Sequence, residues 1–264
     1  MSDQQGRVVV VTGGASGIGA ASAEVLVAVG WRVVVAGHNL EKAKLVADRI
    51  GALAWYIDVS SDDSVTTAAL EIEAKVGPVY GLVNSAGILQ KPLAPHDFPM
   101  QEWDRVQSVN FRGAYVTSLA FARGMLARRK GSIVNISSVS GSRSMPLHSY
   151  APAKAALISM TQCLAAEWGG AGLRINSVAP GYTLTPSLSA AIERGDRQVD
   201  GATRNTPLGE LVKPAQVGNA VAFLLSDRAS AITGVDLPVD CGWLVGTGWD
   251  MYGGLRKSAI VGAA

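Results

Sequence analysis

The chain has 264 residues, of which 48% are hydrophobic and 17% charged, and its formal net charge is +2. This composition is typical of a globular protein rather than a disordered one, and so small a charge gives no electrostatic footprint for nucleic acid or an anionic membrane. No apolar stretch reaches the roughly 18 residues needed to span a bilayer, and the first residues do not form a signal peptide.

Short apolar runs rich in β-branched residues alternate with longer segments of helical periodicity. In chain order, the predicted elements are strand 7–11, helix 17–30, strand 31–36, helix 40–50, strand 52–57, helix 62–76, strand 79–84, helix 101–129, strand 131–137, helix 150–168, strand 173–179, helix 214–226 and strand 235–240. Ser60 or Ser61 is expected to cap helix 62–76, and helix 101–129 is expected to break near Gly113.

The strands are apolar throughout instead of alternating, which is expected when both faces of a parallel sheet are covered. The sequence therefore predicts one α/β domain over residues 1–264, a doubly wound, Rossmann-like parallel sheet of seven strands with helices on both faces. Segment 183–213 is polar and rich in proline and glycine, so a substrate loop is expected there, followed after the last strand by a C-terminal tail over 243–264.

Cysteine and histidine are sparse. Cys163 and Cys241 lie far apart, and the three histidines are dispersed, so neither a disulfide framework nor a metal site is expected. Together with the missing signal peptide, this usage favours a cytoplasmic protein.

A glycine-rich turn, TGGASGIG (12–19), lies between the first strand and the first helix. Gly13, Gly17 and Gly19 allow a tight turn and close approach of a ligand, and the helix that follows offers free N–H groups to a pyrophosphate. The spacing is GxxxGxG rather than the usual GxGxxG, so the alternative is a turn that is merely tight.

The segment YAPAK (150–154) places Tyr150 and Lys154 one helical turn apart, with Pro152 tolerated in the first turn. A cation at this distance is expected to lower the pKa of the phenol and so to suit it for proton transfer near neutral pH. Taken alone, the motif is more often that of a half-buried tyrosine stacked beside a solvated lysine.

Six motifs in order resemble those of the short-chain dehydrogenase/reductase family over about residues 6–242. They are TGGASGIG, NSAG (84–87), NFRG (110–113), NISS (135–138), YAPAK and PGYTLT (180–185). Where the family most often has NNAG, this chain has Ser85, whose hydroxyl is expected to replace the contacts of one amide.

The resemblance implies four catalytic residues. Tyr150 is the general acid/base, Lys154 lowers its pKa and bonds the nicotinamide ribose, Ser138 holds the substrate oxygen, and Asn110 anchors a water that passes protons to the lysine. Ser138 and Asn110 have a plainer alternative, in which each only bonds backbone groups. Because the gap from Ser138 to Tyr150 is one residue shorter than expected, Ser137 is a rival for the serine role.

The resemblance also implies a nicotinamide dinucleotide cofactor. Gly37 stands where an acid would bind the ribose of NAD, and His38 follows, able to donate to a 2′-phosphate with help from Lys42, so NADP is favoured and NAD is the alternative. His38 is otherwise a solvated residue. The implied cofactor contacts are Gly13, Ser16, Gly17, Ile18, Gly19, His38, Asp58, Val59, Asn84, Ala86, Gly87, Tyr150, Lys154, Pro180, Gly181, Thr183 and Thr185.

The substrate is expected between Ser138, Tyr150, segment 183–213 and the C-terminus. Arg143 and His148 are candidate contacts for a carboxylate or hydroxyl-rich substrate, or else surface residues. Aromatic residues of the tail could stack on a sugar or pack between subunits of a homotetramer or homodimer. No nucleic acid or membrane partner is expected.

The leading hypothesis is an oxidoreductase that interconverts a secondary alcohol and a ketone on a sugar, polyol or sugar acid. One alternative is a 3-oxoacyl thioester reductase, with Arg123, Arg128, Arg129 and Lys130 as a basic rim for the carrier. A second is a non-catalytic nucleotide-binding regulator, which would not need Tyr150, Lys154, Ser138 and Asn110 together.

Overall fold

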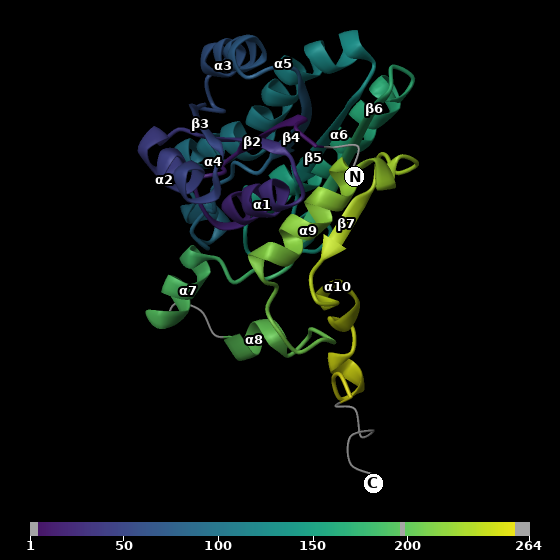
Figure 1. Ribbon diagram of the computed structural model, residues 1–264. Helices are drawn as coiled ribbons and strands as arrows, with labels where there is room; N and C mark the ends of the chain where they lie inside the picture. The colour runs from purple at the N-terminus through teal and green to yellow at the C-terminus, as the bar shows by residue number, and fades with distance from the viewer. Residues whose placement is uncertain (1–4, 196–198, 257–264) are drawn as a thin grey trace.

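The computed structural model describes residues 5–195 and 199–256, and seven parallel strands form its sheet (Figure 1). The order across the sheet is β3-β2-β1-β4-β5-β6-β7, so the chain winds outward in both directions from β1 and β4. The predicted strands and their parallel arrangement are confirmed. Their bounds are β1 (Val8–Thr12), β2 (Arg32–Gly37), β3 (Leu53–Tyr56), β4 (Val79–Asn84), β5 (Gly131–Ile136), β6 (Leu173–Pro180) and β7 (Asp236–Val239).

Alternate side chains of each strand enter two different apolar cores, one on each face of the sheet. In β1, Val8 and Val10 pack in the core covered by α3 (Asp62–Lys75), α5 (Gly113–Arg128) and α6 (Tyr150–Gly169). Val9 and Val11 pack in the core covered by α1 (Gly17–Ala28), α2 (Leu40–Ile50) and α9 (Pro214–Leu225). The doubly wound prediction is therefore confirmed, and it explains why the strands carry no polar face.

The predicted break in helix 101–129 has a specific form. The chain forms α4 (Met100–Gln107), then a π-helical turn at Ser108–Arg112, and then α5. The first residue of α5 is a glycine, Gly113, because a Cβ there would lie 2.9 Å from the carbonyl oxygen of Val59. Of the two predicted caps for α3, Ser61 is the one that accepts a hydrogen bond from Ser64 N.

Segment 183–213 is not a plain loop. It contains α7 (Pro186–Glu193) and α8 (Val199–Thr203), and its two ends are joined by a parallel bridge between Thr183 and Val212. Residues 196–198, and the last part of the tail at 257–264, lie outside the described residues.

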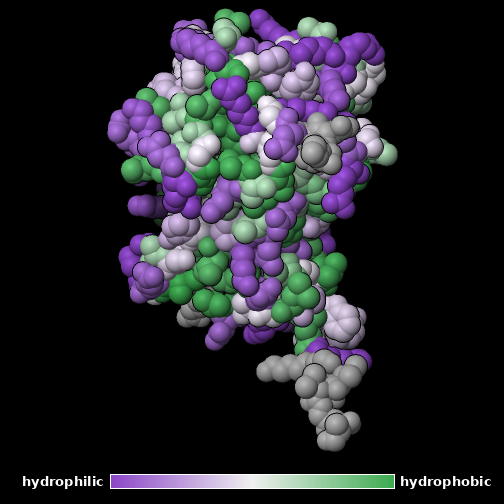
Figure 2. Space-filling model, viewed as in Figure 1, coloured by the Kyte–Doolittle hydropathy of each residue, from purple (hydrophilic) through white to green (hydrophobic). Residues whose placement is uncertain are grey.

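The tail begins with α10 (Trp243–Gly246), which lies with α7 and α8 beyond the carboxyl ends of the strands (Figure 1). We call segment 183–213 together with the described part of the tail the lower lobe. Exposed apolar side chains such as Leu208 and Val245 belong to it, and Figure 2 shows hydrophobic residues at its surface. Across residues 5–195 and 199–256, no helix is both long and apolar enough to cross a membrane.

Candidate active site

The glycine-rich turn at the carboxyl end of β1 is packed too tightly for side chains. Gly13 has a φ of +65°, and a Cβ on it would lie 2.7 Å from both the nitrogen and the Cα of Ala86. A Cβ on Gly19 would overlap the carbonyl oxygen of Gly13. Thr12 Oγ1 accepts hydrogen bonds from Ser85 N at 3.2 Å and Ala86 N at 3.4 Å, which fixes the turn against the end of β4.

The start of α1 is suited to an anion. Ser16 caps the helix without a side-chain hydrogen bond, and the first turn carries no acidic residue. The first intrahelical bond runs from Ala20 N to Ser16 O, which leaves the N–H groups of Gly17, Ile18 and Gly19 without helical acceptors. These donors, and the space left by the missing Cβ atoms, fit the pyrophosphate of a dinucleotide.

The segment after β6 meets this anion site. A Cβ on Gly17 would lie 3.4 Å from Thr185 Cγ2, so the PGYTLT segment crosses close to the start of α1. Thr185 caps α7 by accepting from Leu188 N, and buried Thr183 donates to Gly181 O at 2.9 Å. Pro180 is in register with Val239 of β7.

Asn84 and Asn110 are buried and bond within the fold, although Asn84 Oδ1 has no hydrogen-bond partner among the described residues. Asn84 Nδ2 donates to Asn135 Oδ1 at 2.8 Å and to Ser118 Oγ at 2.9 Å. Asn110 Nδ2 donates to Ile88 O at 2.9 Å, and its Oδ1 accepts from Ile88 N at 3.1 Å. The side chain of Asn110 is thus committed to backbone groups, and its role in anchoring a water stays a prediction.

Gly87 connects this wall to the lysine. A Cβ at Gly87 would lie 2.7 Å from Asn110 Oδ1 and 3.8 Å from Lys154 Nζ, so the glycine opens the space in front of both. Ser85 N donates to Thr12 Oγ1 at 3.2 Å, and the Ser85 hydroxyl has no partner among the described residues, so its replacement of an amide's contacts stays a prediction.

Ser138, Tyr150 and Lys154 meet where β5 ends and α6 begins. The side chains of half-buried Tyr150 and Ser138 lie close enough to interact, and this interaction favours the ionised phenol. Ser138 Oγ also accepts from Ser140 N at 3.1 Å, which holds it in place. Buried Lys154 donates from Nζ to Ile136 O at 2.7 Å, and this nitrogen lies 5.5 Å from the centre of the Tyr150 ring.

Ser137 points elsewhere. Its Oγ is 2.6 Å from Asp236 Oδ1 and 2.8 Å from Val178 O, and the residue is 2% exposed. Both partners belong to the neighbouring strands β6 and β7. Of the two serines, only Ser138 faces Tyr150.

The pKa values of Tyr150 and Lys154 are shifted in directions that the sequence did not indicate. Burial raises the pKa of Tyr150 to about 12, against a smaller lowering by its interaction with Ser138. Burial also lowers the pKa of Lys154 to about 8. The expected lowering of the pKa of Tyr150 is therefore wrong for the protein alone: loss of solvent raises it, and Lys154, which is bonded to Ile136 O, is not among the groups that shift it.

Two glutamines hold the start of α6, and sequence reasoning missed both. Gln90 is buried, and its Oε1 accepts from Ser149 N at 2.6 Å and from Tyr150 N at 2.8 Å. Gln107 Nε2 donates to Ser149 O at 2.8 Å. Neither residue belongs to a recognisable motif, and no pattern along the sequence signals these contacts.

The predicted adenosine end lies beyond β2 and β3. Gly37 is buried at the end of β2, and His38 beside it is exposed. Asp58 Oδ1 accepts from Ser60 Oγ at 2.6 Å and from Ser60 N at 2.9 Å; these bonds hold the pKa of Asp58 below its usual value, and the nearby charge of His38 adds to the effect. Val59 is buried against Gly113.

Arg143 and His148 line a hollow of about 450 Å³ together with residues of α6 such as Pro152. Neither Ser138 nor Tyr150 is among the described residues that line it. Arg143 donates only to the neighbouring carbonyl of Ser142, at 3.0 Å. The geometry therefore gives these two residues no contact with the Ser138–Tyr150 pair, and their substrate role stays a prediction.

The C-terminal tail packs on the PGYTLT segment. The rings of Tyr182 and Trp243 pack edge to face, with their centroids 5.8 Å apart. A Cβ on Gly242 would lie 2.8 Å from the side chain of Pro207. The tail and segment 183–213 thus form one wall beyond the ends of the strands.

The basic rim considered for an acyl carrier lies elsewhere. Arg128, Arg129 and Lys130 immediately precede β5, at the amino ends of the strands, whereas Tyr150 lies at the carboxyl ends. Arg128 is also paired with Glu73 at 2.9 Å. In the part of the chain that the structure describes, no group of three or more acidic, histidine or cysteine side chains could hold a metal ion.

Comparison with known proteins gives a consistent family. A family model described as enoyl-(acyl carrier protein) reductase matches residues 13–244. Galactitol 2-dehydrogenase (L-tagatose-forming) of Cereibacter sphaeroides is 38% identical over 91% of this chain and 96% of its own length. A short-chain type dehydrogenase/reductase of Sinorhizobium fredii is 37% identical over 91% of this chain, which spans only 44% of that longer relative.

Solved structures agree over nearly the whole chain. A structure titled ribose-5-phosphate isomerase from Brucella melitensis has a TM-score of 0.94 and 47% identity, covering 97% of this chain and 99% of its own. A structure titled as a NAD(P)-dependent gluconate 5-dehydrogenase from Beutenbergia cavernae, with bound NADP, has a TM-score of 0.84 and 36% identity, covering 91% and 98%.

The family model spans most of the chain, and relatives above 30% identity, matched over nine tenths of it, are dehydrogenases. The sheet order, the glycine-rich turn and the Ser138–Tyr150–Lys154 cluster are consistent with that family. The chain belongs to the short-chain dehydrogenase/reductase family and is an NAD(P)-dependent alcohol dehydrogenase.

Proposed function

We propose that the protein interconverts a secondary alcohol and a ketone on a small polar substrate, namely a sugar, a polyol or a sugar acid, with NADP as cofactor. The observation that carries the proposal is the cluster of Ser138, Tyr150 and Lys154 at the carboxyl edge of the sheet, beside a glycine cradle that fits a pyrophosphate. The neighbouring hydroxyls of Ser138 and Tyr150 can both turn to a substrate oxygen placed between them.

The bound nicotinamide supplies or accepts the hydride. In the reduction of a ketone, Tyr150 donates its phenolic proton to the substrate oxygen while Ser138 Oγ donates a hydrogen bond to the same atom. The raised pKa of Tyr150 supports reduction as the direction that needs no prior ionisation of the enzyme. Lys154 fixes α6 on the end of β5, because its ammonium is bonded to Ile136 O.

The cofactor is held, in this proposal, by the residues that the family resemblance implies. The N–H groups at the start of α1 bind the pyrophosphate, Asp58 and Val59 lie at the adenine, and Thr183 and Thr185 lie near the nicotinamide. NADP is favoured over NAD because Gly37 puts no carboxylate at the end of β2, and exposed His38 can donate to a 2′-phosphate. The neighbour titled with bound NADP supports the same choice.

Replacing His38 with Asp tests the cofactor choice directly. An acid at this position would repel a 2′-phosphate and accept a bond from a free ribose hydroxyl. We expect the ratio of kcat/KM for NADP to that for NAD to fall by about tenfold or more, equivalent to about 1.4 kcal/mol. An unchanged ratio would mean that His38 does not contact the cofactor. The same ratio measured for Lys42→Gln shows how much Lys42 contributes to the preference for NADP.

The substrate class rests on the relatives, of which one is a galactitol dehydrogenase and one is titled a gluconate 5-dehydrogenase. The thioester alternative is less well supported, because Arg128 and its basic neighbours lie at the other edge of the sheet. A second candidate comes from the neighbour titled ribose-5-phosphate isomerase, whose similarity includes the lower lobe. An isomerase would convert an aldose phosphate to a ketose phosphate without net change in the cofactor.

The first experiment follows the absorbance of the reduced nicotinamide with NAD and NADP in parallel, against polyols, sugar acids, secondary alcohols and 3-hydroxyacyl thioesters. Ribose 5-phosphate is assayed alongside for ketose formation. Turnover of a polyol or sugar acid supports the proposal, and turnover of thioesters alone or of ribose 5-phosphate alone contradicts it. Tyr150→Phe should keep cofactor binding but lower kcat by about 10²–10⁴-fold. If turnover survives this change, Tyr150 is not the proton donor.

We also propose that the protein assembles as a homotetramer or homodimer. Large apolar side chains remain exposed on two helices, with Tyr115 and Leu119 on α5 and Phe223 on α9. Sedimentation of the wild type and of a Leu119→Lys variant tests this idea. A monomeric wild type contradicts it.

A further inference from the structure

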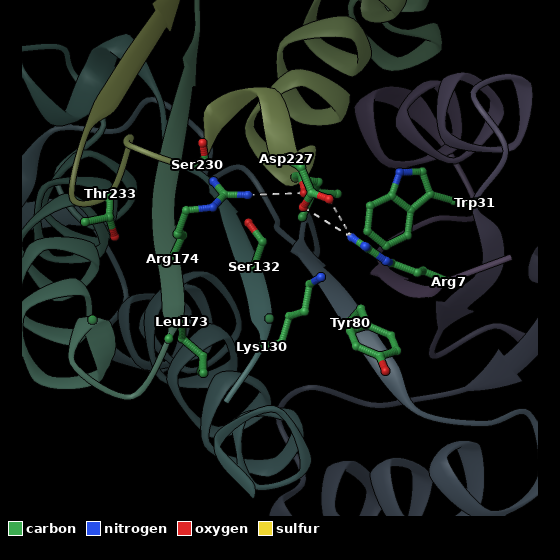
Figure 3. Close-up of a pocket in the computed structure, with 14 residues that line it drawn as sticks. Arg7, Trp31, Tyr80, Lys130, Ser132, Leu173, Arg174, Asp227, Ser230 and Thr233 are labelled. Atoms are coloured by element: carbon green, nitrogen blue, oxygen red, sulfur yellow. Dashed lines mark hydrogen bonds and ion pairs between the residues drawn. The ribbon is translucent and has the colours of Figure 1, made fainter. Parts of the chain in front are cut away.

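A cavity of about 350 Å³ lies at the amino ends of the strands, on the edge of the sheet opposite Tyr150 (Figure 3). We call it the amino-edge cavity. It is lined by the residues at which β1, β4, β5 and β6 begin and by the turn after α9. The lining residues on which its chemistry depends are Arg7, Trp31, Lys130, Arg174, Ser230 and Asp227.

The charges in this cavity do not balance. Arg7, Lys130 and Arg174 line it, and Asp227 is the one carboxylate among the described residues that do. Figure 3 shows the three cationic side chains converging from different strand ends on the space beside Asp227. One carboxylate against three cations leaves an excess of two positive charges.

Asp227 is already engaged by one of the three. Arg7 Nη1 lies 3.2 Å from both carboxylate oxygens of Asp227, and the arginine side chain is 18% exposed. The side chain of Lys130, in contrast, has no hydrogen bond or ion pair with any described residue. Its ammonium is therefore available to a ligand.

Arg174 is held rigidly at the cavity wall. Its guanidinium donates to four carbonyl oxygens, those of Leu224 at 2.6 Å, Ser226 at 3.0 Å, Leu225 at 3.2 Å and Ile232 at 3.4 Å. Burial lowers the pKa of Arg174, and among the described residues Asp227 is the one charge that offsets this effect. Arg174 therefore contributes its positive charge to the cavity while its donors hold the wall.

Trp31 forms part of the apolar wall. It is 4% exposed, and its Nε1, which has no hydrogen-bond partner among the described residues, is buried away from the open space.

We propose that the amino-edge cavity binds the phosphate group of a small anionic molecule, at a site separate from the dinucleotide. A phosphate monoester carries about −1.5 to −2 charges at neutral pH, which matches the excess of two positive charges. Ammonium and guanidinium groups are the donors that bind phosphate most often. The volume is near the lower end of the range of about 300–1,000 Å³ for small-molecule sites, enough for a phosphate and a few more atoms.

The test uses the enzyme saturated with NADP, because phosphate also binds the empty start of α1. Inorganic phosphate is titrated at constant ionic strength against sodium chloride, and the midpoint of thermal unfolding is measured. A ligand of the folded state raises this midpoint in a saturable way. Glycerol 3-phosphate and glycerol form the second pair of probes: tighter binding of glycerol 3-phosphate than of phosphate identifies a metabolite as ligand, and equal binding identifies free phosphate.

Two matched variants decide where the anion binds. Lys130→Gln should weaken phosphate affinity by about tenfold or more, whereas Arg228→Gln should leave it unchanged, because exposed Arg228 neighbours Asp227 but does not line the cavity. Ser230→Asp adds a carboxylate to the wall and should also weaken binding. No saturable shift, or the same affinity in both glutamine variants, would mean an adventitious ion only and would overturn the proposal.

Discussion

Replacing Gln90 with Leu should damage both stability and turnover, because one oxygen atom of this side chain fixes the start of α6, which carries the proposed proton donor Tyr150. Gln90 Oε1 accepts from Ser149 N at 2.6 Å and from Tyr150 N at 2.8 Å. Leucine has a similar volume and no acceptor, so the change removes both bonds without opening a large cavity. The first turn of a helix has no other acceptors for these N–H groups.

The size of the effect follows from these two donors. Gln90 is 4% exposed, so the donors are not simply returned to water. A buried donor left without a partner costs about 1–3 kcal/mol, and two donors give about 2–6 kcal/mol, with the lower half of the range expected if a water enters. A displacement of about 1 Å in a reacting group can cost about 10²-fold in rate, so we expect kcat to fall about 10–100-fold.

The free energy of unfolding is measured by urea denaturation with linear extrapolation, together with kcat and KM for each substrate. Gln101→Leu is the matched control, because Gln101 is exposed on α4, and it should stay within about 0.5 kcal/mol of wild type. Gln90→Glu keeps an acceptor oxygen at a helix N-terminus and should lie between the two. The reasoning is refuted if Gln90→Leu unfolds like Gln101→Leu, or loses stability with an unchanged kcat.

Three further predictions concern the same site. Ser138→Ala should lower kcat by about 10²-fold or more with little loss of stability. Ser137→Ala removes a bond to Asp236, so it should lower the free energy of unfolding by about 1.5–3 kcal/mol and leave kcat near wild type. Enzyme kinetics and urea unfolding curves of the two variants test this difference. Gly87→Ala should lower kcat, because its Cβ would lie 2.7 Å from Asn110 Oδ1, and a variant as active as wild type would contradict that packing. The pKa of Lys154 is about 8 in the folded protein and about 10.4 in the unfolded chain. Between these two values the unfolded chain binds more protons, so the free energy of unfolding rises with pH. The urea midpoint should therefore differ between pH values near the two ends of this window for wild type, but not for Lys154→Met.

The sheet could be predicted from the sequence because burial on both faces leaves a direct mark on it. The four valines of β1 are all buried, and a strand with no polar face is typical of a parallel sheet that helices cover on both sides. Helix α2 has the predicted bounds, since Asn39 caps one end and Gly51 the other in a left-handed conformation. The glycine-rich turn could be located for the same reason, because close packing excludes side chains.

Segment 183–213 shows where local signals mislead. Its proline and glycine content indicated a loop, yet Pro186 occupies the first turn of α7 and Thr185 caps it. The residues that suggest a break are thus the ones that begin a helix. Only the surrounding packing separates the two outcomes.

Contacts between distant segments could not be predicted at all. Gln90 reaches Ser149 across 59 positions, and nothing near either residue indicates the pairing. The direction of the pKa shift of Tyr150 was predicted wrongly for a related reason. The spacing of Tyr150 and Lys154 gives their distance along a helix, but the loss of solvent around them depends on the whole fold.

The bridge between Thr183 and Val212 brings the two ends of segment 183–213 together beside the end of β6. Ser138, Tyr150 and Lys154 lie on a different part of the chain, at the end of β5 and the start of α6. If segment 183–213 lines the substrate site as proposed, insertions, deletions or exchanges between its joined ends would change the substrate wall and leave these three residues in place. Such a division would let one scaffold acquire new substrates by grafting, and it makes a chimera with the equivalent segment of another dehydrogenase a practical route to altered specificity.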